Sequence, residues 1–374
     1  MKEIPTDLKK LMTQINKKYQ RKEGRPVTMF MTEDVSFQID TFSTGSLMLD
    51  LALGRGGIPR GYIVELFGEN MSGKTTLCML SIASFQREEE KKSEENYDYQ
   101  ERYAVFVDAE QTFDIKLARE YGVNTDKLIY SRPLTAEEAI DTASAYIESG
   151  HVGLCVIDSV PALVPSKIAE SSIEQQTMGE LARFMGKTMQ KLVGPSKLNE
   201  VTIMFVNQVR EKIGVMYGNP MTTPGGKALP FYSSVRLHVR AGEKIKAKDE
   251  VIGHQMKVRV VKNKFAIPFK EAEFPLMYGV GVDRIHEVAQ LSVIAELVRS
   301  TGAWIRYEDE EGEVIKIDGV EMKFNGRAKF IDALREVPEL LHRLESKLRG
   351  VDIEAPDTEI LEADQSEENM QFGS

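Results

Sequence analysis

Eight residues, Gly68 to Thr75, have the types and spacing of a phosphate-binding loop. They read GENMSGKT, which matches G-x-x-x-x-G-K-[ST], between an expected strand and an expected helix. Gly68 and Gly73 let the backbone approach a phosphate closely, so that backbone N–H groups and the helix N-terminus face the anion. Lys74 would reach the outer phosphates, and the Thr75 hydroxyl would bind Mg²⁺. The plainer alternative is a glycine-rich turn that binds nothing.

Carboxylates stand at the ends of two apolar stretches. Residues 154–159 (LCVIDS) place Asp158 at the end of an expected strand, and residues 104–110 (AVFVDAE) place Asp108 and Glu110 at the end of another. The first acid can hold the Mg²⁺ shell opposite the phosphate-loop threonine. A carboxylate of the second pair can orient and deprotonate the water that attacks a γ-phosphate. Acids that merely cap strands are the alternative reading.

A third stretch, residues 208–228 (QVREKIGVMYGNPMTTPGGKA), has neither strand nor helix periodicity. It leaves the apolar run 202–208 (TIMFVNQ), and loops of this length inside a compact domain are uncommon and usually functional or disordered. Its glycines let the backbone wrap a phosphodiester chain, its cations supply charge, and Met216 and Tyr217 can stack or wedge against bases. A plain surface loop is the alternative.

The elements that must position these residues alternate in type along the chain. Between residues 62 and 206, apolar runs separated by helical patterns predict an α/β fold with a mainly parallel sheet. The expected strands are 62–67, 104–109, 154–159 and 202–207. Residues 7–22 predict a short basic helix with one apolar stripe, and residues 84–102 read as a charged surface insertion.

The second half of the chain adds more strands and then a smaller α+β unit. Further strands are expected in 229–282, within 233–240, 256–264 and 271–279. The smaller unit covers about 284–350, with a helix at 285–300, a hairpin around Trp304–Lys316 and a helix at 328–349.

Composition narrows the class of protein. Most of the net charge of −10 comes from residues 351–374, which hold eight acids and no Lys or Arg and read as a disordered acidic tail. Residues 1–26 and 236–270 are basic, which favours anionic partners, although a solvated face explains either stretch alone. No apolar run reaches the ~18 residues of a membrane span, and the first residues lack a signal-peptide core. Cys78 and Cys155 lie in apolar runs, which favours reduced core thiols of a cytoplasmic protein over a disulfide.

Several long strings resemble one known family. FSTGSLMLDLALGRGGIPRGYIVELFGENMSGKTTL, FVDAEQTFD, VIDSV, FVNQVREKIGVMYGNP and VVKNKFAIPFKEAEF are similar, in this order, to the bacterial RecA recombinases. The similarity runs from about residue 8 to 345. It implies an α/β fold with a RecA-type P-loop ATPase core, a mainly parallel central sheet, an N-terminal helix and a small α+β C-terminal domain. The implied divisions are 1–40 for subunit docking, 41–283 for the core, 284–350 for the small domain and 351–374 for the tail.

The resemblance also implies an activity and its partners. Such a protein forms a helical homo-oligomeric filament on single-stranded DNA with ATP and Mg²⁺. It pairs that strand with homologous double-stranded DNA and exchanges strands during recombination and repair, with DNA-stimulated ATP hydrolysis. The expected place is the cytoplasm of a bacterium or of a phage-infected host.

Site residues carry over from the family by position. Glu110 matches the catalytic base, Gln208 the sensor of the γ-phosphate, and Lys262 and Lys264 the lysines that reach a neighbouring subunit's ATP. The nucleotide and its metal would be held by Gly68, Glu69, Asn70, Met71, Ser72, Gly73, Lys74, Thr75, Thr76, Asp114 and Asp158, of which Thr75 and Asp158 face the metal. Two DNA loops, 171–179 and about 209–223, would contribute Met178, Gly179, Arg210, Lys212, Gly214, Val215, Met216 and Asn219, with Arg183 nearby. Phe231 matches a residue of the subunit interface.

The chain departs from the family's pattern in a few places. Leu117 stands where the family often has a Tyr that stacks on adenine, which puts that stacking in doubt. Pro230 replaces an interface Lys, Gln190 replaces an Arg near DNA, and residues 69–72 read ENMS rather than the usual PESS. The insertion at 84–102 is longer than usual. These departures point to a divergent member, for which a phage is one source.

Two other functions fit a phosphate-loop protein. A ring helicase would want an arginine finger acting in trans and would lack the N-terminal docking helix. A small-molecule kinase would need an acceptor pocket with a lid, for which 208–228 is poorly suited.

Overall fold

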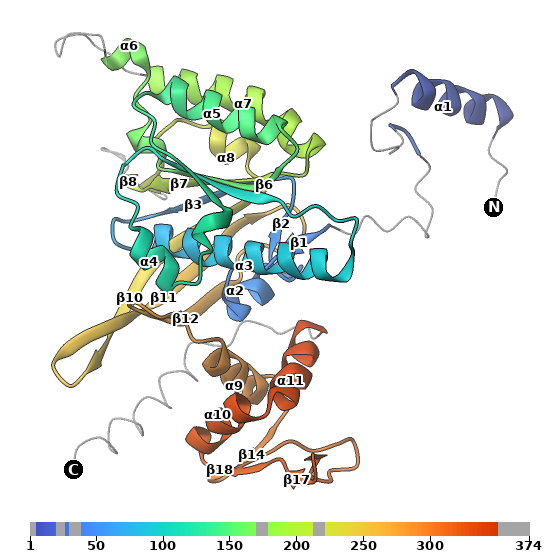
Figure 1. Ribbon diagram of the computed structural model, residues 1–374, viewed down its shortest axis with the longest axis vertical. Helices are drawn as coiled ribbons and strands as arrows, with labels where there is room; N and C mark the ends of the chain where they lie inside the picture. Colours follow the sequence, from blue (N-terminus) through green and yellow to red (C-terminus); the bar gives the residue numbers. More distant parts are fainter. Residues whose placement is uncertain (1–4, 20–26, 30–38, 170–178, 212–220, 351–374) are drawn as a thin grey trace. The chain divides into compact units, whose positions relative to one another are not determined.

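The computed structural model of the protein describes residues 5–19, 27–29, 39–169, 179–211 and 221–350 (Figure 1). The chain forms two compact units, Met1–Ile39 and Asp40–Ser374. In the first unit, the predicted basic helix is present as α1 (Thr6–Lys18), and none of its residues is buried. The Asn16 side chain joins its last turn to the backbone of Thr28.

The second unit is built on a nine-stranded sheet with the order β13-β12-β11-β10-β3-β7-β6-β4-β5. From β10 to β5 every neighbouring pair is parallel, and the three pairs from β10 to β13 are antiparallel. The predicted mainly parallel α/β sheet is therefore confirmed. The strands are β3 (Ile63–Gly68), β4 (Tyr103–Asp108), β5 (Leu128–Ser131), β6 (Val152–Asp158), β7 (Thr202–Gln208), β10 (Val235–Ala247), β11 (Glu250–Asn263), β12 (Glu271–Met277) and β13 (Gly281–Val282).

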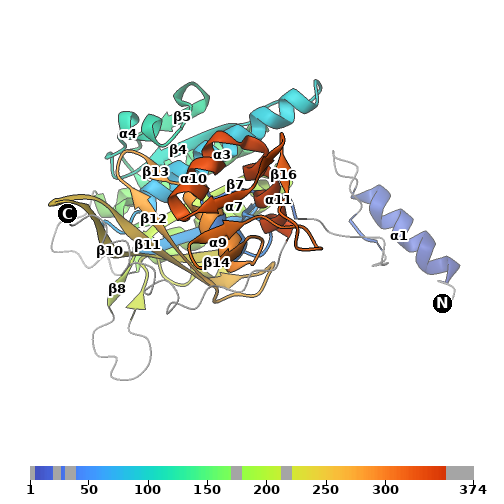
Figure 2. The same ribbon diagram turned by 90° about the horizontal axis from the view of Figure 1, so that it is seen from below.

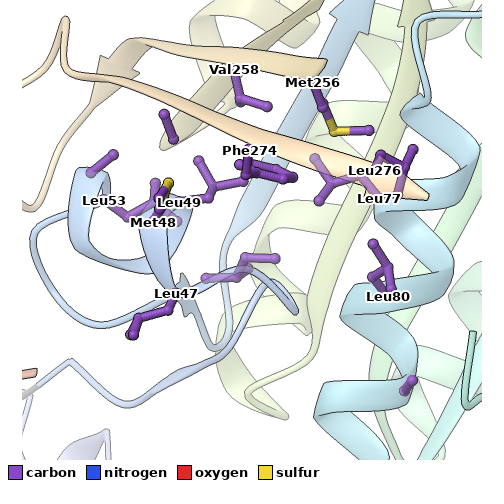
Figure 3. Packing of buried hydrophobic residues seen from close by; sticks show 14 of the residues in the cluster. Leu47, Met48, Leu49, Leu53, Leu77, Leu80, Met256, Val258, Phe274 and Leu276 are labelled. Carbon is purple, nitrogen blue, oxygen red and sulfur yellow. The ribbon is translucent and has the colours of Figure 1, made fainter. Parts of the chain in front are cut away.

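Helices cover both faces of this sheet, because its central strands are apolar on both sides (Figure 1). On one face lie α2 (Leu47–Ala52), α3 (Lys74–Glu95) and α4 (Ile115–Glu120), which share one buried cluster with the sheet. Figure 3 shows part of this cluster, where Leu49 of α2 lies beside Phe274 and Leu77 of α3 lies beside Leu276 of β12. On the other face lie α5 (Ala136–Glu148), α7 (Glu180–Leu198) and α8 (Ala228–Tyr232), with a second buried cluster.

Short elements join these layers. They are β1 (Thr41–Phe42), β2 (Ile58–Pro59), the 3₁₀ turns Thr125–Lys127 and Val160–Ala162, α6 (Ser166–Ala169), β8 (Arg210–Glu211) and β9 (Met221–Thr222). The β8–β9 pair closes the base of the predicted DNA loop, with Arg210 opposite Thr222.

Strand β10 separates two kinds of side chain. Val235, Leu237 and Val239 belong to the buried cluster on the α3 face. The alternate residues Arg236, His238 and Arg240 point to the other face, because successive side chains of a strand alternate.

Most side chains of the charged stretch 84–102 are exposed or half-buried, as the sequence predicts, but part of the stretch is helical and packed. Its first half continues α3 to Glu95, and Phe85 and Glu89 are buried. Glu89 accepts hydrogen bonds from Arg60 and from the Tyr99 hydroxyl, both 2.6 Å away. The buried ion pair allows this acidic part of α3 to pack against the core. The charged residues of the sequence do not by themselves predict this packing.

Residues 284–350 form the smaller α+β region, seen as one group from below (Figure 2). Its helices are α9 (Arg284–Ile294), α10 (Arg327–Glu336) and α11 (Pro338–Gly350), and its strands are β14 (Arg299–Thr301), β15 (Trp304–Arg306), β16 (Lys316–Ile317), β17 (Val320–Glu321) and β18 (Lys323–Asn325). A bridge between Glu308 and Val314 matches the predicted hairpin.

Two helix lengths in this region were predicted wrongly. The expected helix 285–300 ends at Ile294, since Glu296 has a left-handed φ of 53° and the Leu297 and Val298 amides turn back to the Ser292 carbonyl. The expected helix 328–349 is two helices, because Pro338 cannot continue α10 and begins α11 instead.

Both cysteines are buried free thiols, as predicted. Within the described ranges, no helix combines the length and the apolar character needed to cross a bilayer.

Candidate functional site

The predicted phosphate loop connects β3 to α3 through tight backbone geometry. A Cβ on Gly68 would lie 1.9 Å from the Val239 carbonyl oxygen of β10, so only glycine fits there. Gly73 precedes the helix with a φ of 89°, and a Cβ on it would lie 2.4 Å from Met256 Cε. Both glycines therefore allow the strand–loop–helix turn that presents backbone N–H groups at the start of α3.

Lys74 is buried at the first turn of α3. Its ammonium group donates to the carbonyl oxygens of Gly68 and Glu69 and to the Ser72 hydroxyl. Burial lowers the pKa of Lys74, while the nearby charges of Asp158 and Glu110 oppose this shift. The side chains of Glu69, Asn70 and Met71 are exposed around it.

Thr75 and Asp158 meet at the ends of two elements. The Thr75 hydroxyl donates to an Asp158 carboxylate oxygen over 2.6 Å, which joins α3 to the end of β6. Burial raises the pKa of Asp158 to about 6, and Glu110 and Asp108 add to this increase. A hydroxyl and a carboxylate fit Mg²⁺, which takes oxygen ligands and often keeps one or two carboxylates plus substrate phosphates. The described residues contain no group of three or more His, Cys, Asp or Glu side chains that would form a complete metal cage.

Glu110 is exposed beside this pair, directly after β4. Its backbone N–H donates to the Asp158 carbonyl, and its carboxylate accepts a hydrogen bond from the Ser159 hydroxyl. Asp108, the other acid of this strand end, is instead buried, where it accepts from the Phe113 N–H and the Tyr130 hydroxyl. Of the two acids that the sequence offered, Glu110 is the one placed to meet solvent.

Ser159 was not predicted as a site residue. The only sequence signal was its place next to Asp158, at the end of the strand that neighbours β4.

The end of β7 is hydrogen-bonded to the phosphate loop. Gln208 lies opposite Gly68 in the parallel register of β7 and β3, and the Val209 N–H donates to the Gly68 carbonyl over 3.3 Å. The residue that links β7 to β8 is therefore hydrogen-bonded to the first residue of the phosphate loop.

A buried polar chain supports this junction, and sequence reasoning missed it. Asn207 donates to Glu65 over 2.9 Å and to the Pro224 carbonyl over 3.2 Å. Arg236 donates to the other Glu65 oxygen over 2.6 Å. The available sequence signal for this chain was Glu65, a charged residue inside the apolar strand 62–67. A buried carboxylate needs a partner, because burying it without one costs free energy.

A basic cleft of about 260 Å³ lies next to this junction, on the face of the sheet opposite α3. Its cationic or ionisable lining comprises Arg236, His238, Arg240 and Arg259, and Val209, Thr222 and Thr223 close it from the loop side. The Arg236 guanidinium lies over the Phe67 ring, and the His238 ring stacks parallel to the same ring at 4.9 Å. Burial lowers the pKa of His238, and the charge of Arg240 acts in the same direction.

The remaining predicted residues fall in three groups. Asp114 caps α4 by accepting from the Lys116 and Leu117 amides, and Thr76 is hydrogen-bonded to Tyr121. Gly179 precedes α7 with a φ of 87°, and the exposed Arg183 pairs with Glu180. Met178, Lys212, Gly214, Val215, Met216 and Asn219 lie outside the described residues.

The predicted interface residues cluster around α8. Lys262 donates to the Pro230 and Phe231 carbonyls at the end of this helix, and Phe231 is 73 % exposed. Lys264 is exposed at the end of β11. In the single chain, Lys262 is thus engaged with its own subunit, whereas Lys264 faces outward.

A family model described as the RecA N-terminal domain matches residues 6–283 of the chain. The match covers most of the sequence and contains the phosphate loop, Asp158, Glu110, Gln208 and the basic cleft.

Proposed function

The chain belongs to the RecA family, and we propose that it is an ATP-dependent recombinase that assembles on single-stranded DNA and exchanges strands with homologous DNA. Membership of this family implies the use of nucleotide and Mg²⁺ in general. The observation that carries the finer proposal is the junction at Gly68, where the phosphate loop and the segment leading to β8 share a hydrogen bond.

In this proposal the chain's own groups divide the work of hydrolysis. Lys74 and the backbone N–H groups of α3 hold the phosphates, while Thr75 and Asp158 hold Mg²⁺. Bound Mg²⁺–ATP supplies the phosphoanhydride bond that is cleaved. Glu110 accepts the proton of the attacking water, and Ser159 keeps the Glu110 carboxylate oriented through its hydroxyl.

DNA would bind beside the junction. The basic cleft, together with Arg210 at the start of β8, offers a cationic surface that suits a phosphodiester backbone. Gln208 would sense the γ-phosphate, because it ends β7 opposite Gly68. ATP could then bias the order of the 209–223 loop, which is the proposed link between nucleotide and DNA.

Assembly would involve the surface around α8. Phe231 and Lys264 are exposed there, and a Lys264 ammonium is free to reach an anion on a neighbouring subunit. Lys262 would first have to leave the carbonyls of α8. Helix α1 and the divisions at 40/41, 283/284 and 350/351 keep their predicted roles within this proposal.

The test compares ATP hydrolysis with and without single-stranded DNA, followed by strand exchange between homologous plasmid substrates. A recombinase should show DNA-stimulated hydrolysis, filaments on DNA by electron microscopy, and joint molecules. Rings without strand exchange would indicate the helicase alternative. Hydrolysis indifferent to DNA would favour a small-molecule kinase and contradict the proposal.

A further inference from the structure

His254 is a buried histidine that no motif of the sequence singles out. It lies on β11, opposite Leu276 of β12, and only 6 % of its surface is exposed. Its Nε2 atom is 3.7 Å from the position that a Cβ on Gly73 would occupy. The imidazole ring therefore reaches the residue that precedes α3, from the antiparallel side of the sheet.

One ring nitrogen of His254 is satisfied and the other is not. Nδ1 lies 3.2 Å from the Tyr278 hydroxyl. Among the described residues, Nε2 has no hydrogen-bond partner, although it is fully buried. Such an atom is unusual, because buried polar groups are nearly always paired and an unpaired one costs about 1–3 kcal/mol.

The surroundings of Nε2 suggest what its partner would be. When the Tyr278 hydroxyl donates to Nδ1, the ring proton is on Nε2, so the ring presents a donor toward the start of α3. That helix end presents further donors and the positive end of its dipole. Two sets of donors can be satisfied together only by an acceptor, and an anionic one is favoured. Burial lowers the pKa of His254, which favours the neutral ring.

We propose that His254 is a nucleotide-binding residue, whose Nε2–H donates to an acceptor oxygen of the bound nucleotide and whose orientation is fixed by Tyr278. The inference rests on the proposed function, since it needs a nucleotide at the phosphate loop. The acceptor is an oxygen of the phosphates or of the sugar, and both offer the same hydrogen-bond chemistry.

The test measures the equilibrium affinity of the full chain, without DNA, for ADP and for inorganic tripolyphosphate. His254→Leu should bind ADP about tenfold more weakly than the unchanged chain, the effect of one lost hydrogen bond. Leucine suits the site, because Met256 and Leu276 lie next to it. His254→Gln keeps a donor near the Nε2 position and should recover most of the affinity. Weaker binding of both probes assigns the acceptor to the phosphates, and weaker binding of ADP alone assigns it to the sugar.

A second readout observes the ring of the unchanged protein directly. The chain has five histidines, so ring ¹⁵N spectra of the unchanged protein are simple, and the His254 signals can be assigned from their absence in His254→Gln. Addition of ADP should shift its Nε2 resonance. The exposed His151→Gln is the matched control and should leave ADP affinity unchanged.

Two outcomes separate this inference from the function on which it rests. If the unchanged chain binds ADP, Lys74→Ala does not, and both His254 variants bind as tightly as the unchanged chain with no Nε2 shift, His254 is not a nucleotide ligand. If the unchanged chain binds neither probe, the proposed nucleotide site itself is wrong.

Discussion

Glu110 carries the proton-transfer step in the proposed reaction. Glu110→Gln should bind nucleotide and DNA normally, because its shape is kept, but should hydrolyse ATP about 10²–10⁴-fold more slowly. Single-turnover hydrolysis with DNA present measures the chemical step directly. Ser159→Ala should reduce the rate of hydrolysis by a smaller factor, since the Glu110 carboxylate remains and only its hydroxyl partner is removed. Normal turnover by Glu110→Gln would show that another group is the base.

Gln208 stands between nucleotide and DNA in the proposed switch. Gln208→Ala should still bind ATP, because Lys74, Thr75 and the backbone of the phosphate loop remain. Its affinity for single-stranded DNA should be nearly equal in the presence of a non-hydrolysable ATP analogue and in the presence of ADP. The lost coupling should be about 1–3 kcal/mol, or roughly 5–150-fold in affinity. A variant that keeps the full ratio between the two nucleotides would mean that the loop is ordered by another contact.

Helix α3 has a buried carboxylate in its second half, Glu89, which pairs with Arg60 and Arg102. The Arg60 guanidinium lies over the Phe42 and Phe85 rings and donates to Glu89, and both charged side chains are almost fully buried. Arg60→Met should reduce the free energy of unfolding by about 3–5 kcal/mol, because Glu89 would keep its buried charge and lose this partner.

The double variant Arg60→Met/Glu89→Leu is the informative comparison for this pair. It should be more stable than the sum of the two single changes predicts, since the two buried charges that face each other are removed together. Urea unfolding of the four proteins gives the coupling. Strict additivity would mean that the two side chains do not interact energetically.

Sequence reasoning worked best where one element decides the outcome. The phosphate loop, the parallel strands and the acids at their ends follow from local patterns, and the structure has Gly68, Thr75 and Asp158 in the expected strand–loop–helix setting. It worked less well where distant residues decide. Glu89 needs Arg60, Glu65 needs Asn207 and Arg236, and neither partnership leaves a periodic signal in the sequence.

The join between the core and residues 284–350 contains two buried carboxylates. Glu287 of α9 accepts from the Ser46 hydroxyl and from the Leu47 and Met48 amides at the start of α2. Asp50 of α2 accepts from Ser43 and Thr44. Burial raises the pKa of Glu287 from 4.5 to about 7 and that of Asp50 from 3.8 to about 6.

A raised carboxyl pKa in the folded state means that the protonated form is favoured by folding. The resulting gain in stability is fully present below the pKa values of the unfolded state. It is lost as the pH rises through the pKa values of the folded state. The unchanged protein should therefore lose stability relative to Glu287→Gln between about pH 4.5 and pH 7, by an amount on the order of 1–3 kcal/mol. Urea unfolding across this range measures the difference, with the exposed Glu310→Gln as control. A difference that is flat with pH would contradict the prediction.

The acidic tail, residues 351–374, lies outside the described residues. Its eight carboxylates should compete with DNA phosphates for the basic surfaces of the core. Removal of the tail should strengthen binding to single-stranded DNA and flatten its dependence on Mg²⁺, which otherwise screens the tail. A full-length variant with all eight acids changed to amides is the matched control. Equal affinities at every Mg²⁺ concentration would leave the tail with a passive role.

Strand β10 has a consequence for how this protein can change over evolution. Its valine and leucine side chains pack toward α3, its arginines line the basic cleft, and its Val239 carbonyl touches Gly68 of the phosphate loop. A single inserted or deleted residue would exchange the two faces, burying arginines and exposing valines, while also moving the contact under the phosphate loop. Point substitutions can tune either face separately. A change in the length of this strand alters both faces at once. The length of β10 should therefore vary far less than the length of the hairpin turn that follows it.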